Sequence, residues 1–242
     1  DGNKTVDLDT YANNTFTTVQ LEEHTYTLQS VRSEVIQLIE VLGGDLTVTG
    51  ESTSGSSDTV NFKLKASAMF DTGNGTDADI DVDAVEIINI ETDDSDDTTF
   101  GTATFQIDGD DINTINITGD TGVALTGSAL TTLNTIDGSG ATIGGVSTAT
   151  TIAGIVWDSD NATVGDTTSY TGTNGKDTFT GGSVTDDTFS GGLGIDTLVY
   201  DGRSDTFTGG GGNDVFDVNA DGTSTQFLTI TDLSVGDTIN FA

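Results

Sequence analysis

Aspartates at a fixed spacing are the residues of this 242-residue sequence whose type and pattern could do chemistry. Two pairs lie 18 residues apart, Asp187 with Asp205 and Asp196 with Asp214, and Asp177 lies 19 residues before Asp196. Carboxylates are hard oxygen ligands, which calcium and magnesium prefer to nitrogen or sulfur. Like charges repeated in register also repel one another unless a cation lies between them. The spacing therefore indicates an array that binds calcium.

The residues around these aspartates complete a nine-residue repeat, G-G-x-G-x-D-x-U-x, in which U is apolar. Residues 191–199 and 209–217 match it at every fixed position, and residues 172–180 match most of it. Residues 181–190 carry one extra residue, and residues 200–208 have lost most of their glycines. The apolar U positions are Phe179, Phe189, Leu198, Phe207 and Phe216.

This repeat predicts a parallel β-roll, in which each unit is a six-residue turn followed by a three-residue strand with its central side chain inward. Two units complete one coil, so that turns 18 residues apart lie above one another. Glycines permit a positive φ, which lets turn carbonyls point toward a shared ion. A calcium ion between successive turns would take carboxylate and carbonyl oxygens and relieve the repulsion. The arrangement is that of an RTX calcium-binding β-roll.

The composition restricts the partners and the chemistry of the chain. It has 40 acidic residues against 6 basic ones, a formal net charge of −34. A nucleic acid or an anionic membrane would repel such a chain, so no nucleic-acid partner is expected. There is no cysteine, which excludes disulfides and thiolate metal sites. His24 is the single histidine, and no zinc-protease or hydrolase motif occurs, so the chain is not expected to be an enzyme.

Four segments are expected in an all-β fold, a Thr-rich β-solenoid or β-helix-like part followed by a parallel RTX β-roll. Residues 1–83 alternate apolar and polar residues and predict a β-rich N-terminal segment. Residues 84–153 predict solenoid-like β repeats, residues 154–170 a connection, and residues 171–242 the calcium-binding roll with its closing strands. Residues 30–44 fit either a helical face or a strand, and their β-branched content favours a strand.

Three stretches within the solenoid-like segment align by their apolar residues. The aligned triplets are Val85, Ile88 and Ile90; Ile112, Ile115 and Ile117; and Leu130, Leu133 and Ile136. Asn89, Asn116 and Asn134 fall at the same phase, 27 and then 18 residues apart. Self-similarity of this kind indicates stacked coils, each of which buries its apolar side against the next.

The sequence resembles the RTX-type bacterial surface-layer (S-layer) proteins over residues 84–241. The residues that carry the resemblance are 194–241, which include GGGGNDVFDVNADG, and 112–140, which are similar to the Thr/Ala/Gly-rich solenoid repeats of that family. The resemblance implies a secreted, extracellular structural protein, exported by type I secretion, that self-assembles with calcium into a two-dimensional lattice on the bacterial cell surface. The implied partners are calcium and further copies of the chain. The secretion signal and the cell-surface anchor are expected in regions outside this sequence.

The resemblance also places the calcium ligands at the five aspartates and at turn residues around them. These positions are Gly172, Asn174, Gly175, Asp177, Gly181, Asp187, Gly191, Gly192, Gly194, Asp196, Asp205, Gly209, Gly210, Gly212 and Asp214. Val184 and Asp201–Gly202 depart from the family pattern in the second and fourth units. The acidic stretches 71–83 and 92–97 match no EF-hand loop and are expected to be solvated loops.

Two other functions are compatible with the sequence. One is a repeat segment of an RTX adhesin that binds a host or matrix ligand. The other is the C-terminal export module of a type I-secreted enzyme or toxin whose catalytic domain lies outside this sequence. Rolls linked to enzymes follow a catalytic fold, and residues 1–150 show no histidine pair or serine motif. The coat subunit is therefore the expected function.

Overall fold

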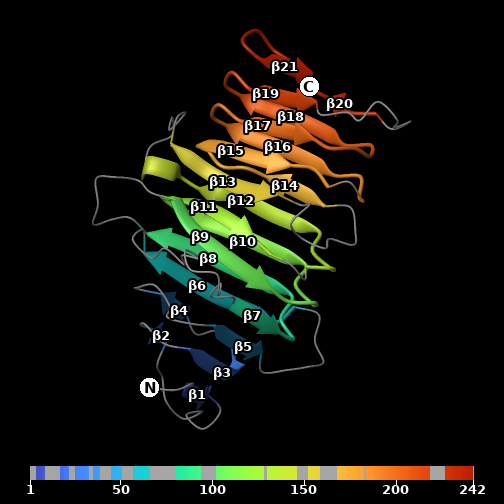
Figure 1. Cartoon of the computed structure of the whole chain (residues 1–242). Helices are drawn as coiled ribbons and strands as arrows, with labels where there is room; N and C mark the ends of the chain where they lie inside the picture. Colours follow the sequence, from blue (N-terminus) through green and yellow to red (C-terminus); the bar gives the residue numbers. More distant parts are fainter. Residues whose placement is uncertain are drawn as a thin grey trace.

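The chain, described here from a computed structural model, forms a stack of parallel β-strands that alternate between two sheets (Figure 1). The structure describes residues 4–8, 17–21, 25–32, 35–38, 45–50, 57–65, 80–93, 102–127, 130–145, 152–158, 168–182, 184–218 and 227–241. His24 and residues 71–79 and 94–97 lie outside this described part, while residues 80–83 and 92–93 belong to strands.

The odd-numbered strands form an 11-stranded sheet, called here the odd sheet. Its strands are β1 (Lys4–Asp7), β3 (Tyr26–Val31), β5 (Leu46–Gly50), β7 (Ile80–Asp83), β9 (Thr102–Asp108), β11 (Gly122–Thr126), β13 (Ala153–Asp158), β15 (Lys176–Thr180), β17 (Thr197–Tyr200), β19 (Val215–Val218) and β21 (Thr238–Phe241). The even-numbered strands form a 10-stranded sheet, called the even sheet. Its strands are β2 (Thr18–Leu21), β4 (Val35–Leu38), β6 (Thr59–Lys65), β8 (Ile87–Asp93), β10 (Thr114–Gly119), β12 (Thr135–Ala141), β14 (Ser169–Thr171), β16 (Thr188–Leu193), β18 (Thr206–Gly211) and β20 (Thr229–Ile230).

Each coil of the stack consists of one strand in each sheet and the turns that join them. Every pairing between the described strands is parallel and joins strands two apart in chain order. Figure 1 shows the coils rising from β1 near the N-terminus to β21 near the C-terminus, at opposite ends of the stack. The expected all-β, parallel solenoid or roll is thereby confirmed. A short 3-10 turn, η2 (Ile143–Gly145), follows β12, and no helix in the described ranges is long and apolar enough to span a membrane.

The core lies between the two sheets, because alternate residues of each strand point inward. One inward column of the even sheet runs in register through Val60, Ile88, Ile115, Ile136, Tyr170, Phe189, Phe207 and Ile230. One of the odd sheet runs through Leu125, Trp157, Phe179, Leu198, Phe216 and Ile239. Each inward side chain thus packs on its equivalents in the coils before and after it, as in other solenoids.

The apolar positions expected to face inward in the nine-residue repeat do so. Phe179, Phe189, Leu198, Phe207 and Phe216 are all 0% exposed. Tyr170 stacks on Phe189 with ring centroids 4.6 Å apart and an interplanar angle of 13°. Phe189 meets Phe207 edge-on at 5.0 Å. Aromatic pairs in these geometries contribute about 0.5–1.5 kcal/mol beyond the area they bury.

The strand ladders continue across the segment boundaries expected from the sequence. β7 pairs with β5 before it and β9 after it, around residue 83. The segment 154–170, expected to be a connection, contributes most of β13 and the start of β14, which pair with β15 and β16. Residues 35–38 form β4, in agreement with the strand alternative for 30–44. The division into four segments stays a prediction, because a continuous ladder is compatible with changes of coil type along it.

The expected alignment of the third solenoid unit was wrong by three residues. Ile88 pairs with Ile115 as expected, but Ile115 pairs with Ile136 rather than with Leu133. Leu133 instead precedes β12 in a turn, three residues before Ile136, as Ile112 precedes Ile115. The sequence was misleading because the Leu130–Leu133 spacing imitates the Ile112–Ile115 spacing.

The asparagine series changes accordingly. Asn116 lies opposite Asp137, and Asn134 is not its counterpart. The main-chain N–H of Asn134 donates to the carbonyl of Asn113 at 3.0 Å. The position after Asp137 is Gly138, where the side chain of Ile155 fills the space that a Cβ would need.

Candidate metal centre

Five aspartates of the repeat are buried where the turns meet the strands. Asp177, Asp196 and Asp214 form the odd column, at the starts of β15, β17 and β19, and Asp187 and Asp205 form the even column, directly before β16 and β18. Their exposed fractions lie between 0% and 1%. A buried carboxylate is costly unless it is hydrogen-bonded and its charge is removed or compensated. The hydrogen-bond partners of each carboxylate therefore decide whether its turn has an oxygen left to bind a cation.

One oxygen of each carboxylate accepts a hydrogen bond from the preceding coil. In the odd column the main-chain N–H of Asp177 donates to Oδ1 of Asp196 at 2.8 Å, and that of Asp196 donates to Oδ1 of Asp214 at 3.0 Å. In the even column the N–H of Asp187 donates to Oδ1 of Asp205 at 2.8 Å. These bonds confirm that turns one coil apart are stacked, as the 18- and 19-residue spacing predicts. They also satisfy main-chain donors that would otherwise be buried without a partner.

In the odd column the first carboxylate has a hydrogen-bond donor at each oxygen, one set from its own turn and one from the preceding coil. Oδ2 of Asp177 accepts from the main-chain N–H of Thr173 at 2.8 Å and from its hydroxyl at 3.0 Å. Oδ1 accepts from the N–H of Ile155 in the preceding coil. No oxygen of this side chain is left without a hydrogen bond.

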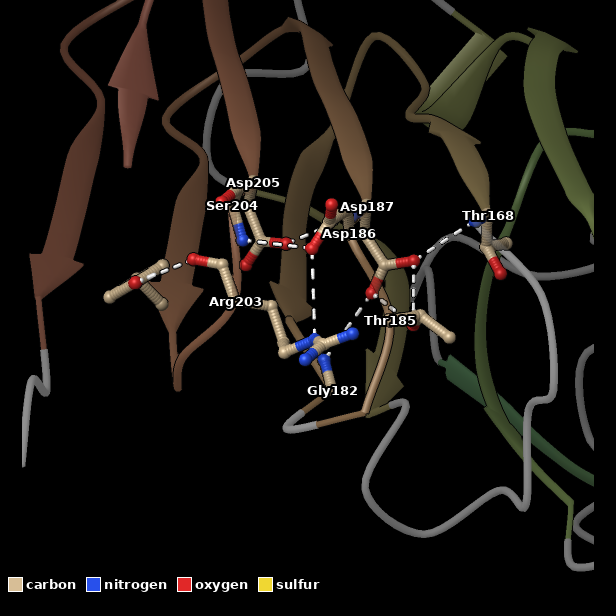
Figure 2. A network of polar contacts seen from close by, with 9 residues as sticks. Thr168, Gly182, Thr185, Asp186, Asp187, Arg203, Ser204 and Asp205 are labelled. Atoms are coloured by element: carbon tan, nitrogen blue, oxygen red, sulfur yellow. Dashed lines mark hydrogen bonds and ion pairs between the residues drawn. The ribbon is translucent and has the colours of Figure 1, made fainter. Parts of the chain in front are cut away.

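The first carboxylate of the even column is occupied in the same way, as Figure 2 shows. The hydroxyl of Thr185 lies 3.1 Å from each oxygen of Asp187. The main-chain N–H of Thr168 donates to Oδ1 at 3.0 Å, and that of Gly182 approaches Oδ2 at 3.4 Å. Four donor contacts thus surround a carboxylate that is 1% exposed.

The carboxylates one coil further on are different. Oδ2 of Asp196 and Oδ2 of Asp205 are buried and have no hydrogen-bond partner. A Cβ added to Gly191 would lie under 3.0 Å from both Oδ2 of Asp196 and the carbonyl oxygen of Gly209. Gly181 similarly faces Oδ2 of Asp205, at 2.9 Å from such a Cβ. The first coil has the same crowding, because a Cβ added to Gly172 would lie under 3.0 Å from Oδ2 of Asp177 and the carbonyl oxygen of Gly191. The coils therefore differ in the hydrogen bonds of their carboxylates and not in the room beside these glycines.

The turns of the odd column depend on the conformational freedom of glycine. Gly192 and Gly210, the second residues of their units, have φ of +100° and +96°. Gly194 and Gly212, the fourth residues, have φ of +142° and +151°. These angles are strained for residues with a side chain, so the glycine pattern of the sequence reflects a backbone requirement.

Burial raises the pKa of all five carboxyls, and most at the ones without a second partner. Desolvation raises the pKa of Asp196 to about 8, and the neighbouring charges of Asp177 and Asp214 add to the rise. Desolvation raises that of Asp205 to about 7 and that of Asp177 to about 6, where hydrogen bonds from Thr173 and Ile155 hold it down. The pKa values of the carboxyls of Asp187 and Asp214 are also raised by desolvation. The raised pKa values favour a proton on Asp196 at neutral pH, and a nearby cation would oppose this rise.

Arg203 is a basic side chain beside the even column (Figure 2). Its Nε lies 3.7 Å from Oδ1 of Asp186, to which the main-chain N–H of Ser204 also donates at 3.1 Å. The side chains of Arg203 and Asp186 are 40% and 55% exposed, so water screens this pair and it contributes little to stability. Its charge opposes the rise in the pKa of Asp205 without reversing it.

Some predicted positions do not face the carboxylates. The main-chain N–H of Ile143, in η2, donates to Oδ1 of Asn174 at 2.6 Å, so this amide joins two coils instead. Val184 is 67% exposed, and open space surrounds the position where Gly202 would carry a Cβ. The weak second and fourth turns expected from the sequence are thus the more open ones.

The closing strands expected at the end of the roll are β20 and β21, but the sequence interpretation assigned no role to Asp232 and Asp237 in the turn between them. Oδ1 and Oδ2 of Asp232 accept from the N–H groups of Gly209 and Gly210 at 2.9 and 2.8 Å. Asp237 accepts from the N–H of Asp214 at 3.0 Å. The signal was present, because Asp237 begins D-T-I-N, which repeats the D-x-U-x end of the nine-residue unit.

The donor set fits a hard cation that accepts main-chain oxygens. Within the described ranges no three acidic or histidine side chains gather closely enough to form a metal site by themselves. Calcium takes a mixture of carboxylate and carbonyl oxygens and so does not require such a cluster. The unpartnered Oδ2 of Asp196, which shares the space beside Gly191 with the carbonyl oxygen of Gly209, matches that preference. No protein-family model matches the chain, and no curated protein matches its sequence.

Proposed function

We propose that this chain is a structural protein whose C-terminal coils are ordered by calcium. One observation carries the proposal: Oδ2 of Asp196 and Oδ2 of Asp205 are buried without any hydrogen bond. A native fold rarely leaves such atoms unpartnered, because each costs about 1–3 kcal/mol and more when charged. A bound cation would remove both the missing contact and the repulsion along each column.

The residues proposed to hold calcium are Asp196, Asp205 and Asp214, together with main-chain oxygens of the glycine turns. Calcium would supply positive charge to carboxyls whose pKa is otherwise raised by burial. Since the sites exist only when the turns are stacked, the free energy of binding becomes free energy of folding. A chain with a net charge of −34 gains further, because bound cations reduce its self-repulsion.

We further propose that the protein is a secreted S-layer subunit that self-assembles with calcium into a two-dimensional lattice on the bacterial cell surface. The support is the resemblance of residues 194–241 and 112–140 to such proteins, and the continuous stack that joins these stretches. The last coil also exposes apolar side chains suited to association, with Val235 101% and Phe241 80% exposed. The proposal assigns the chain no catalytic role.

The test is a calcium titration of metal-free protein, followed by far-ultraviolet circular dichroism, light scattering and electron microscopy. Calcium is expected to increase β-sheet content and then to produce ordered sheets. The double variant D196N/D205N is the control, because it keeps the fold's shape but removes the two charges, and it is expected to need far more calcium. Ordering without association would favour the adhesin or export-module functions. An unchanged spectrum with calcium would contradict the proposal.

A further inference from the structure

Four of the five stacked aspartates belong to two classes that the repeat pattern does not distinguish. Asp177 and Asp187, in the first coil of the repeat, have every carboxylate oxygen hydrogen-bonded within the protein. Asp196 and Asp205, in the second coil, each keep one buried oxygen without a partner. The difference comes from neighbouring residues rather than from the aspartates themselves.

In the odd column the difference comes from the second residue of the unit. This residue is Thr173 in the first coil and Gly192 and Gly210 in the next two. Both glycines adopt a positive φ, and Thr173 does not. In its conformation Thr173 directs its main-chain N–H and its hydroxyl at Oδ2 of Asp177, at 2.8 and 3.0 Å. The position that a cation would take beside this oxygen is therefore filled by donors.

In the even column the difference comes from a threonine two residues before the aspartate. Thr185 places its hydroxyl 3.1 Å from both oxygens of Asp187, and Thr185 is itself buried at 8% exposure. The corresponding residue of the next coil is Arg203, whose nearest carboxylate contact is with Asp186 on the surface. Oδ2 of Asp205 consequently has no hydroxyl to bond.

We infer that the first coil of the roll, residues 172–190, binds no metal because the hydroxyls of Thr173 and Thr185 replace it, and that calcium enters only from Asp196 and Asp205 onward. This inference rests on the proposed function. It assigns calcium to the second and later coils of the roll and none to the first. The first coil is also packed on the coils that precede it in the stack, since Ile136, Tyr170 and Phe189 are in register. It therefore stays ordered without calcium and is the template on which the calcium-dependent coils form.

The first test compares four single variants, D177N, D187N, D196N and D205N, by calcium titration calorimetry and by native mass spectrometry of the full chain. D196N and D205N are expected to lose bound calcium, with affinity lowered by about tenfold or more. D177N and D187N are expected to keep the wild-type number of ions and the wild-type affinity. Loss of calcium in D177N or D187N equal to that in D196N would overturn the inference while leaving the proposed function intact. A wild-type chain that binds no calcium would instead overturn the proposed function.

Two further measurements keep the inference testable if a variant fails to fold. Hydrogen–deuterium exchange of the wild-type chain should show residues 168–182 protected with and without calcium, and residues 191–218 protected only with it. Equal loss of protection in both ranges on calcium removal would contradict the template role. The T173G variant should gain bound calcium and lose calcium-free stability, because it removes a donor hydroxyl and restores the glycine of the repeat. A T173G chain with unchanged calcium binding would argue against the hydroxyl as the replacement.

Discussion

Residues 80–141 and residues 169–218 form the same two-sheet coil with different inward side chains and different coil lengths. The inward column of the first region is aliphatic, with Ile88 above Ile115, and equivalent residues such as Asn89 and Asn116 are 27 residues apart. The second region has an aromatic column, with Phe189 above Phe207, and equivalent residues are 18 apart. A shorter coil with the same two strands leaves less chain for its turns.

The two regions also place their polar groups differently. In the first, amides form a ladder across the even sheet: Asn89 donates to Asn61 at 2.9 Å and accepts from Asn116 at 2.8 Å. Lys63 adds ion pairs to Glu91 at 2.7 Å and Asp93 at 3.1 Å. All these groups are neutral, or are charges of opposite sign near water. In the second region the polar groups are buried aspartates of one sign.

On the proposed function, this difference predicts that the shorter coil depends on a cation and the longer coil does not. In the short coil the turns stack as closely as the strands, so that turn carboxylates are taken out of water beside one another. Desolvation and like charge then raise their pKa values. In the long coil, the polar ladder of the even sheet lies on the outer face, where water and the opposite charge of Lys63 remain available. The odd sheet of this region does stack Asp81 on Asp108, and desolvation together with that like charge raises the pKa of Asp81.

Removal of calcium should produce the largest difference in stability between the two regions. In metal-free protein at pH 8 we expect residues 191–241 to lose their β structure while residues 80–141 keep theirs, because only the former bury unpartnered carboxylates. Hydrogen–deuterium exchange with and without calcium would measure this region by region. Simultaneous loss of protection in both regions would show that they fold as one unit and remove the distinction.

Acid should partly replace calcium in the second region. The folded-state pKa values of Asp196 and Asp205, about 8 and about 7, lie above the ordinary value of 3.8. The metal-free folded state therefore binds more protons than the unfolded state, so its stability is highest below about pH 4 and is lost as the pH rises toward about 8. Thermal unfolding of metal-free protein between pH 5 and pH 8 should show a falling midpoint. A rising midpoint would contradict these shifts.

Core substitutions in the two regions should differ in their effect on the affinity of the chain for calcium. Phe207→Ala removes a fully buried ring and should destabilise its region by about 3–5 kcal/mol. Because calcium binding is coupled to folding there, its affinity for calcium should fall as well. The matched variant Ile115→Ala should cost about 2–5 kcal/mol in the first region and leave calcium affinity unchanged. Denaturant unfolding and calorimetry would measure both quantities, and a calcium effect of Ile115→Ala would argue for coupling between the regions.

The smallest effect is expected from the amide ladder of the first region. Asn89→Ala removes one hydrogen bond to Asn61 and one from Asn116, at a cost of about 1–2 kcal/mol. Calcium affinity should not change. The control is Thr208→Ala, which removes one hydroxyl contact with Thr231 and should cost less. An Asn89→Ala chain as stable as wild type would show that water replaces the ladder without loss.

Much of the second region could be predicted from the sequence because its repeat is short. The register between neighbouring strands follows directly from that repeat length. The spacing of the aspartates gave the coil length, and the apolar positions gave the inward side chains, all of which are buried. In the first region the coil length varies, and Leu130 and Leu133 imitated the spacing of Ile112 and Ile115. A single sequence has no means to distinguish an apolar turn residue from an apolar strand residue at equal spacing.

The sequence by itself determined the strand-and-turn pattern, the inward side chains and the stacking of the aspartates in two columns, because these depend on local periodicity. Only the tertiary structure decided which carboxylates are satisfied. The donors of Thr173 and Thr185 reach Asp177 and Asp187, whereas no donor reaches Oδ2 of Asp196. Those contacts depend on backbone angles and on the stacking of one coil against the next, which residue types and spacing do not specify.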